Sequence, residues 1–304
     1  MMSLQAYYDT RYAPITFDYA NFLVCAEAYR QSINLPRINL HVVASSFRDI
    51  SVRDVKFMND EKFWRVNHIL MRIPNLIPSI SQVTLYKTPP ETLFYPTFPS
   101  TYPPRTPEES LSVTPYLMDR VSKFHNLGCN VRPFKASNHA RKLVKDFTSD
   151  KPYFTISLRT SNFQIERNSN LEEWYKVYSA LKESSFNVFV IPDFEDILTK
   201  NEAKKYDWKL VEFAAFELDL RLALYENAID NLCVSNGTSV IAFYSNSPVK
   251  MFKIVVDGIT ATSEKSLKYS SGVARGNAPS FCKDNQKWIW EDDTFENIMA
   301  TLKS

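Results

Sequence analysis

The sequence predicts an α/β protein of two lobes, each built on a parallel sheet with crossover helices. Short apolar runs alternate with stretches of helical spacing along most of the chain, which is typical of a parallel sheet. The length, 304 residues, favours two domains over one, and an apolar content of 44% is enough for buried cores. We place the boundary near residue 140, so that residues 1–140 form the first lobe and 141–304 the second.

In the first lobe the expected elements are strands at 4–8, 38–44 and 82–86 and helices at 17–31 and from 59 to 73. Asn59 and Asp60 are helix-start residues, and Pro74 ends or kinks the second of these helices. Its apolar residues recur at helical spacing, which predicts that Phe63 and Val66 face the core.

A proline-rich segment at 87–115 interrupts the alternation in the first lobe. It holds eight prolines interleaved with aromatic residues, so no regular element is expected there. Its aromatic content predicts that the segment packs over a surface, either as a structural cover or as a wall that contacts substrate.

The second lobe repeats the alternating pattern. Expected before and at the boundary are a helix at 116–125, a strand at 130–134 and a short basic helix at 139–147. Then follow strands at 153–158, 187–191, 232–235 and 249–255 and helices at 170–184, 216–228, 238–244 and 294–302. On the helix before the strand at 232–235, Arg221 and Glu226 are expected on the surface, with Arg221 paired to Glu217.

Composition excludes several classes of protein. Lys and Arg number 36 against 34 Asp and Glu, without a basic stripe, so nucleic acid is not an expected partner. The four cysteines and four histidines are scattered, which predicts neither a zinc site nor a disulfide framework, and hence a reducing cytoplasmic setting without a metal. No secretory signal and no membrane span of about 20 apolar residues is recognised, although peripheral association with a membrane-bound assembly stays compatible with the sequence.

Glycine is scarce. Only five occur, and none are closely spaced in the pattern of a P-loop or a dinucleotide fingerprint. We therefore expect no bound NAD, FAD or other cofactor, and no P-loop ATP site.

The most informative stretch is Leu232 to Tyr244, where an apolar strand stops at Asn236-Gly237 and helical spacing begins at once. In a parallel sheet such a turn lies at the carboxyl edge of the strands, where ligands of open α/β folds bind. Asn236, Gly237, Thr238 and Ser239 are therefore candidate contacts to a phosphorylated ligand, the alternative being an ordinary turn that binds nothing.

A second group of candidates follows the strand at 153–158. Arg159 comes directly after it, and Arg167 and Asn168 precede the helix that starts near Asn170. Guanidinium groups match phosphate oxygens in two-point geometry, so these residues are candidate diphosphate ligands. The alternative is that Arg159 pairs with a carboxylate and that Arg167 is solvated.

Carboxylates mark two further places. Asp193, close to Glu195, follows the strand at 187–191 and is a candidate contact to sugar or ribose hydroxyls, with a helix start as the alternative. In the first lobe Asp9 and Asp18 surround the first strand-to-helix connection and are the candidates for a general base, although Asp18 is also placed as a helix cap. Arg48 and Asp49, after the second strand, form an alternative acceptor site.

Several of these motifs together resemble a known group of enzymes. A strand, an Arg-bearing loop and a helix, then Leu-Ala-Leu-Tyr-Glu-Asn-Ala at 222–228 and Val-Ser-Asn-Gly-Thr-Ser at 234–239, resemble the carboxyl-terminal half of glycosyltransferases with the two-lobed GT-B fold. That resemblance implies two Rossmann-like lobes, with the nucleotide-sugar in the second lobe at Arg159, Arg167 and 236–239 and no divalent metal. The stretches at 14–18 and 61–65 are similar to uncharacterised proteins encoded among bacterial surface-polysaccharide genes.

The expected function is a metal-independent glycosyltransferase that moves a sugar from a nucleotide-sugar donor to a polysaccharide or glycolipid acceptor. Two alternatives stay open. One is a nucleotide-sugar epimerase or hydrolase of the same fold, and the other is a non-catalytic sugar-nucleotide-binding or scaffold protein.

Overall fold

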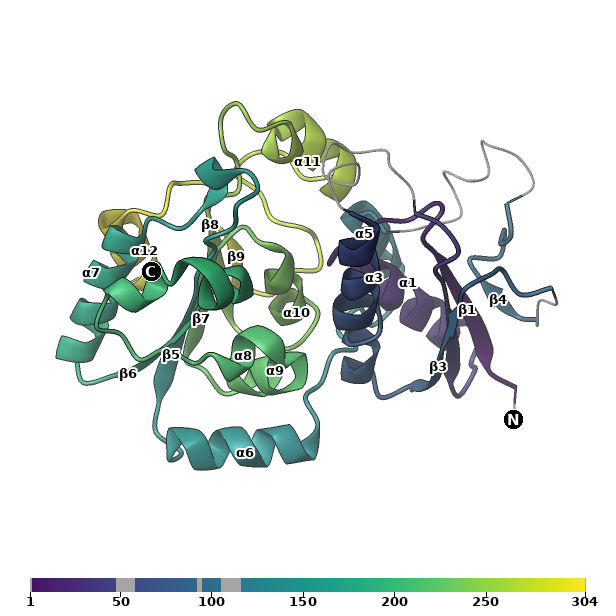
Figure 1. The fold of residues 1–304 in the computed structure, drawn as a ribbon, viewed down its shortest axis with the longest axis horizontal. Helices are drawn as coiled ribbons and strands as arrows, with labels where there is room; N and C mark the ends of the chain where they lie inside the picture. Colours follow the sequence, from purple (N-terminus) through teal and green to yellow (C-terminus); the bar gives the residue numbers. More distant parts are fainter. Residues whose placement is uncertain (1, 48–57, 92–94, 105–115, 304) are drawn as a thin grey trace. The chain divides into compact units, whose positions relative to one another are not determined.

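The computed structural model describes residues 2–47, 58–91, 95–104 and 116–303. Contacts within the chain divide it into two compact units, Met1–Phe134 and Lys135–Ser304. One unit holds a four-stranded sheet and the other a five-stranded sheet, and helices flank both (Figure 1). The α/β class with two parallel sheets is therefore confirmed.

The strands of the first unit all run parallel, in the order β3-β2-β1-β4. Their bounds are β1 Leu4–Asp9, β2 Ile38–Val43, β3 Ile80–Tyr86 and β4 Thr97–Phe98. The order reverses between β1 and β4, because β2 and β3 extend the sheet in one direction and β4 joins the other edge. In open α/β sheets ligands bind outside the carboxyl ends of the strands at such a reversal, and Asp9 is the last residue of β1 there.

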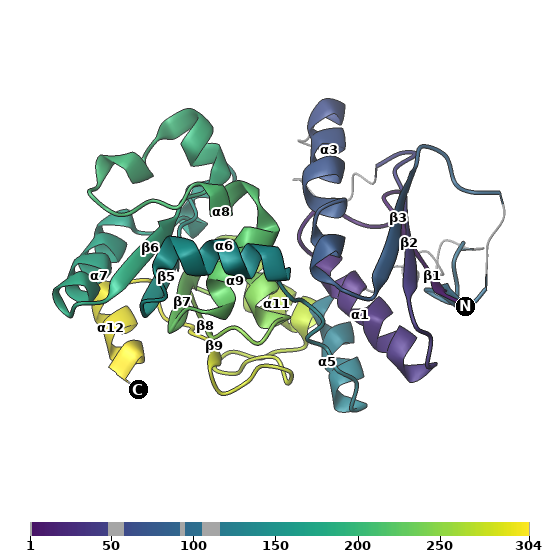
Figure 2. The ribbon, with the colours of Figure 1, turned by 90° about the horizontal axis from the view of Figure 1, so that it is seen from below.

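Helices cover one side of this sheet. They are α1 Tyr19–Ser32, α3 Asn59–Arg65 and α5 Met118–Asn126, and Figure 2 shows them on the same side of β1, β2 and β3. Tyr8 of β1 packs against Tyr19 and Phe22 of α1, with ring centroids 4.4 and 5.0 Å apart. Alternate residues of β1 point to opposite faces, so Tyr8 joins this core and Tyr7 faces the other side of the sheet.

The second helix of this unit differs from its prediction. In α3 the side chains of Lys62 and Arg65 are buried, whereas Phe63 is 46% exposed. A π-helical turn, Val66–Leu70, follows α3, and a 3-10 turn at Ile73–Leu76 contains Pro74. A π turn adds a residue and shifts the buried face, so simple helical spacing assigns Val66 to the core correctly and Phe63 wrongly.

The described part of the proline-rich segment packs on the sheet. Phe98 is 6% exposed and contacts Phe22 and Tyr29, and Tyr102 is 4% exposed and stacks on Tyr7 with centroids 4.7 Å apart. Phe98 and Tyr102 therefore cover the sheet, whereas Tyr95 is 75% exposed, and contact with substrate stays a prediction. Residues 92–94 and 105–115 lie outside the described residues, as do Arg48 and Asp49.

The second unit has five parallel strands in the order β6-β5-β7-β8-β9. They are β5 Tyr153–Ser157, β6 Asn187–Ile191, β7 Asp230–Val234, β8 Val249–Phe252 and β9 Gln286–Trp288. Four of the five were predicted, and β9 was missed because three residues are too short for a recognisable pattern. The segment 130–134, predicted as a strand, is irregular.

Helices lie on both faces of this sheet (Figures 1 and 2). One face carries α7 Leu171–Glu183 and α12 Phe295–Lys303, and the other carries α8 Phe213–Phe216, α9 Leu218–Glu226 and α10 Val240–Phe243. The remaining helices are α6 Asn138–Thr148, which packs on α9, and α11 Glu264–Ser271.

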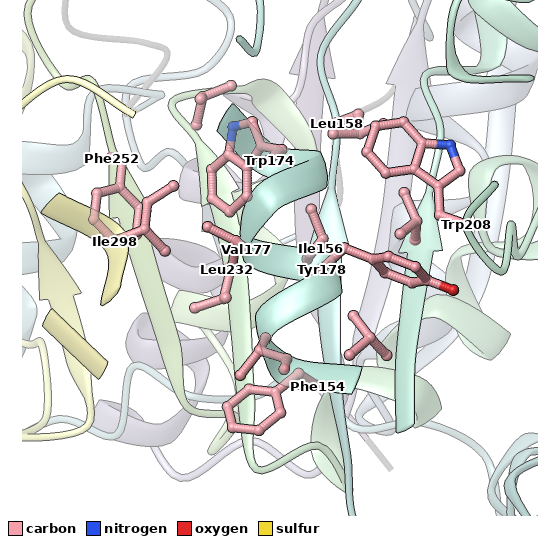
Figure 3. Packing of buried hydrophobic residues seen from close by; sticks show 14 of the residues in the cluster. Phe154, Ile156, Leu158, Trp174, Val177, Tyr178, Trp208, Leu232, Phe252 and Ile298 are labelled. Atoms are coloured by element: carbon pink, nitrogen blue, oxygen red, sulfur yellow. The ribbon is translucent and has the colours of Figure 1, made fainter. Parts of the chain in front are cut away.

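The core beneath α7 is the largest apolar cluster described in this unit. Trp174 and Val177 of α7 point onto Ile156 and Leu232, and Phe252 and Ile298 close one side (Figure 3). Asn170 caps α7, because its side chain accepts a hydrogen bond from the backbone N–H of Glu173.

Arg221 and Glu226 are not the surface residues that the sequence predicts. Arg221 is 4% exposed, and Glu226 binds Arg141 of α6 through an Nε to Oε2 distance of 2.7 Å. Most of α9 is buried, and α6 packs on it, so the spacing of its charged residues does not predict which of them are exposed.

Candidate functional site

The topology of the second unit places the candidate site at the carboxyl edge of its sheet. The strand order reverses between β5 and β7, so the loops that follow these two strands leave the sheet on opposite faces. The sequence candidates Arg159, Arg167 and Asn168 lie in the first loop, and Asn236 lies in the second. In open α/β sheets this reversal is the place where ligands bind.

Arg159 organises the loop after β5. Its guanidinium donates to the carbonyl oxygens of Gln164 and Phe163, at 3.0 and 2.5 Å, and to the side-chain oxygen of Asn168. Its backbone exchanges hydrogen bonds with Ser169, both of 2.9 Å. Arg159 is 7% exposed, so its donors hold the loop in shape in place of facing a ligand.

Asn168 joins this loop to the segment that follows β8. Its side-chain oxygen accepts from Arg159 and from the backbone N–H of Ser161, and its carbonyl oxygen accepts from Nζ of Lys253 at 3.0 Å. Lys253 follows β8 and also lies 3.5 Å from Oδ1 of Asp293. Asn168 therefore links the hydrogen bonds of the loop after β5 with Lys253. Lys253 is a cation at the site that the sequence analysis missed.

Arg167 connects the two loops at the reversal. Nη1 donates to the side-chain oxygen of Gln164 at 3.0 Å, and Nη2 donates to the carbonyl oxygen of Ser235 at 3.2 Å. Ser235 directly precedes the Asn236-Gly237 turn. The structure thus brings Arg167 to the turn, as the predicted convergence requires, whereas Arg159 lies one layer deeper in its own loop.

The Asn236-Gly237 turn has the predicted strand-turn-helix form, with a shorter helix. A 3-10 turn at Gly237–Ser239 leads into α10. The side-chain oxygen of Asn236 accepts from the N–H of Ser239 and from the hydroxyl of Thr238, both at 2.9 Å. Asn236 therefore caps the turn with its side chain, and Gly237 is the exposed residue at its tip.

Asp193 faces the loop after β5 from the end of β6. Its carboxylate accepts from the N–H groups of Thr160 and Glu195, at 3.4 and 3.2 Å. Burial raises the pKa of Asp193 above its ordinary value, and hydrogen bonds to the backbone oppose that shift. Its partial burial and its position at the strand end place it beside the other candidates.

Thr160 is a second residue that the sequence reasoning missed. It is 5% exposed, and its hydroxyl is buried without a hydrogen-bond partner in the structure. A buried hydroxyl without a partner loses its hydrogen bonds to water and gains none in the protein, which costs free energy. A hydrogen-bond acceptor on a ligand would satisfy it. The available signal was its place directly after Arg159 at a strand end.

In the first unit Asp9 is a structural anchor. It is fully buried at the end of β1, and Arg11 binds it with Nη2 to Oδ2 at 2.6 Å and Nε to Oδ1 at 3.0 Å. The hydroxyl of Tyr102 donates to the same carboxylate at 2.9 Å. Asp9 therefore joins the end of β1 to Arg11 and to Tyr102 of the proline-rich segment.

Asp18 differs from Asp9 in its position and its exposure. It is exposed at the start of α1, and its side chain makes no capping hydrogen bond to the helix. The hydroxyl of Thr16 donates to Oδ2 at 2.7 Å and orients the carboxylate. The predicted helix-cap role is therefore wrong for the side chain, although Asp18 does occupy the cap position.

Clusters of metal ligands and membrane-spanning helices are both absent from the described residues. Within the described ranges, His, Cys, Asp and Glu side chains form no group of three or more that could hold a metal ion. None of the helices described combines the length and the apolar character needed to cross a bilayer.

Comparison with known proteins gives a likeness in structure alone. No protein-family model and no curated protein matches the chain. E. coli ADP-heptose lps heptosyltransferase II is similar with a TM-score of 0.52 and 11% identity, over 99% of this chain and 98% of that one. E. coli heptosyltransferase WaaC with ADP (TM-score 0.48, 10% identity, 99% of both chains) is also similar. So is a family 9 glycosyl transferase from Veillonella parvula (TM-score 0.45, 10% identity, 99% and 89% of the chains).

At these identities the likeness concerns the fold. Heptosyltransferase II matches along nearly the whole chain, and both units described above have the parallel α/β sheets that the resemblance implies. The chain therefore has the GT-B-like fold.

Proposed function

We propose that this protein is a glycosyltransferase that moves a sugar from a nucleotide-sugar donor to a polysaccharide or glycolipid acceptor without a metal ion. The observation that carries the proposal is the hydrogen bond from Nη2 of Arg167 to the carbonyl oxygen of Ser235. It holds a guanidinium at the turn that ends β7, where the strand order reverses and an anionic ligand is expected.

Three groups are suited to the donor's diphosphate. Arg167 supplies charge and a planar set of donors, Lys253 supplies a second cation, and the partnerless hydroxyl of Thr160 supplies a neutral donor. When the bond from sugar to diphosphate breaks, negative charge grows on the leaving phosphate. Donors and cations that are already in place stabilise that charge, so they lower the barrier as a bound metal would.

The neighbouring residues have supporting roles in this proposal. Arg159 and Asn168 fix the loop that carries Arg167, and the turn at Asn236 holds Gly237 and Thr238 beside it. Asp193 offers carboxylate oxygens to ribose or sugar hydroxyls. Ser239 closes the turn, since its N–H and its hydroxyl both bind Asn236.

We assign the general base to Asp18. Transfer to an acceptor hydroxyl requires a group that removes the proton as the new bond forms. Asp18 is exposed and ordered by Thr16, whereas Asp9 is buried and engaged by Arg11 and Tyr102. The first unit would therefore bind the acceptor, as the sequence predicts.

The solved heptosyltransferases suggest a donor class. Heptosyltransferase II is named for ADP-heptose and lps, and its fold likeness makes a nucleoside-diphosphate sugar the first donor to test. We propose a cytoplasmic location with peripheral association to a membrane assembly, since polysaccharide and glycolipid acceptors are built at membranes.

Ligand binding is the first experiment. Nucleoside diphosphates and inorganic pyrophosphate are screened by thermal shift; a ligand at 100 times its dissociation constant stabilises the folded state by about 2.7 kcal/mol. We expect Arg167→Met to abolish the shift. Arg141→Met is the matched control, because Arg141 pairs with Glu226 and, among the described residues, makes no hydrogen bond or ion pair with the loops after β5 and β7, and its variant should respond like the wild type.

Turnover distinguishes the remaining alternatives. Nucleotide-sugars are incubated with and without a lipid-linked saccharide acceptor, and release of nucleoside diphosphate is measured in EDTA. Release that needs the acceptor and persists in EDTA supports the proposal. Release without acceptor favours the epimerase or hydrolase, and binding without release favours the non-catalytic protein. Absence of any shift with all diphosphates would refute the proposed site.

A further inference from the structure

Arg221 is a buried cation behind the strands that carry the candidate site. It belongs to α9 and is 4% exposed. Nε donates to the hydroxyl of Tyr225 at 2.7 Å, and Nη1 donates to the carbonyl oxygen of Ala214 at 3.3 Å. The guanidinium carbon also lies 5.4 Å from the centroid of the Tyr225 ring.

No carboxylate neutralises this charge. Among the residues that the structure describes, no Asp or Glu lies within ion-pair distance of Arg221, and no acceptor of Nη2 is found. Arginine is almost never buried without a partner, because removing a charge from water is costly. The sequence pairs Arg221 with Glu217, yet the only hydrogen bond between them joins backbone atoms.

Hydrogen bonding gives the cation a direction. Nε of arginine can only donate, so the oxygen of Tyr225 accepts from it and the Tyr225 hydroxyl hydrogen is left to donate. Oγ of Ser157 lies 2.7 Å from the Tyr225 hydroxyl oxygen and is the acceptor within reach of that hydrogen. The Ser157 hydroxyl hydrogen is then free to point away from Tyr225. The hydrogen bonds from Arg221 through Tyr225 to Ser157 therefore align their positive ends toward the end of β5.

That end is the candidate site. Ser157 is the last residue of β5, two residues before Arg159, and it pairs with Cys233, two residues before Ser235. Two residues of strand span about 7 Å, so the relay ends roughly that far from both loops. The charge of Arg221 also reaches the Cys233 thiol. Burial raises the pKa of this thiol to about 12, and the nearby charge of Arg221 opposes that rise.

We infer that Arg221 is a positioning residue whose unneutralised charge, relayed through Tyr225 to Ser157, strengthens binding of a diphosphate at the β5 and β7 loops. The ligand anion is the counter-charge that the protein itself does not supply. This inference rests on the proposed function, because it needs a phosphorylated ligand at that edge.

The expected size of the effect follows from electrostatics. A unit charge about 10 Å from an anion, in an effective dielectric of about 20, changes the binding constant on the order of tenfold. Loss of the charge should therefore weaken pyrophosphate about tenfold and inorganic phosphate less, because the effect scales with ligand charge. A purely structural role predicts lower stability without that dependence on ligand charge.

The test is calorimetric titration of the full chain with inorganic pyrophosphate and with inorganic phosphate. Arg221→Met removes the charge, Arg221→Lys keeps it, and Tyr225→Phe cuts the relay. Arg141→Met is the matched control, since it removes an arginine that contacts the other end of α9. We expect about tenfold weaker pyrophosphate binding for Arg221→Met, up to about threefold for Arg221→Lys and Tyr225→Phe, and no change for the control.

The outcomes separate the two proposals. Wild-type pyrophosphate affinity in folded Arg221→Met overturns the inference while the proposed function stands, provided that Arg167→Met still loses binding. An equal loss for phosphate and pyrophosphate also overturns it. If Arg221→Met does not fold, Arg221→Gln takes its place under the same criteria. A wild-type protein that binds neither anion refutes the proposed function itself.

Discussion

Asp293 is the residue through which the carboxyl-terminal segment holds the candidate site, and its replacement gives the sharpest stability prediction. Its side chain is buried, and Oδ2 accepts from the N–H of Asn170 and from the indole N–H of Trp174, both at 2.8 Å. Oδ1 lies 3.5 Å from Nζ of Lys253. One carboxylate thus ties together the start of α7, the core tryptophan and the end of β8.

Asp293→Ala removes both hydrogen bonds and leaves a buried indole N–H and a backbone N–H without acceptors. A hydrogen bond to a charged group contributes about 1.5 to 3 kcal/mol, so the two together give a loss of roughly 3 to 6 kcal/mol in the free energy of unfolding. Asp293→Asn keeps one side-chain oxygen that can accept both hydrogen bonds and loses only the contact to Lys253. Its loss should be about 1 kcal/mol.

Urea denaturation followed by tryptophan fluorescence measures both variants, because Trp174 reports on the core beside the substituted residue. The midpoints are compared at equal m-values, so that the change is one of stability and not of the denatured state. A loss below about 1 kcal/mol for Asp293→Ala, or an equal loss for both variants, would refute the hydrogen-bond account.

Three further predictions test the assigned roles. Asp18→Asn should lower kcat at least a hundredfold with diphosphate binding unchanged, whereas Asp9→Asn should mainly lower the unfolding temperature; the reverse pattern in kinetics and thermal melts would exchange the two roles. Burial lowers the pKa of His41, so the unfolded chain binds more protons, and the free energy of unfolding should fall as pH drops below about 6.5; a flat profile, or one unaltered in His41→Gln, contradicts this. Arg159→Ala should cost both stability and the diphosphate shift, and a shift lost without a change in unfolding temperature would make Arg159 a direct ligand.

The alternation of strands and helices was readable from the sequence because apolar runs in parallel sheets are buried on both faces. The strands at 4–9, 38–43, 153–157 and 187–191 each form such a run. The short strands β4 and β9 were not predicted, since two or three residues are too few to show a periodic pattern. The π turn after α3 was not predicted either, because it changes the helical period on which the prediction depends.

The candidate site was predicted in outline and not in its contacts. Strand ends identified Arg167 and the Asn236 turn, but the direction of a side chain depends on loop conformation that no local pattern fixes. Arg159 was predicted as a diphosphate ligand, and its guanidinium donates to the carbonyl oxygens of Gln164 and Phe163 in its own loop. The spacing of Arg221 and Glu217 predicted a surface position for Arg221. Arg221 is buried instead, because α6, which lies far away in the sequence, packs on α9.

Lys253 occupies a backbone conformation that most side chains avoid. Its φ is +57°, in the left-handed region where glycine or asparagine is the usual occupant. Glycine there would relax the main chain, yet it would also delete the ammonium that reaches the carbonyl oxygen of Asn168. Lys253 therefore combines an unfavourable backbone conformation with an ammonium group that is held in one place. Backbone strain of this kind is concentrated at functional sites, which is consistent with a role for Lys253 in binding.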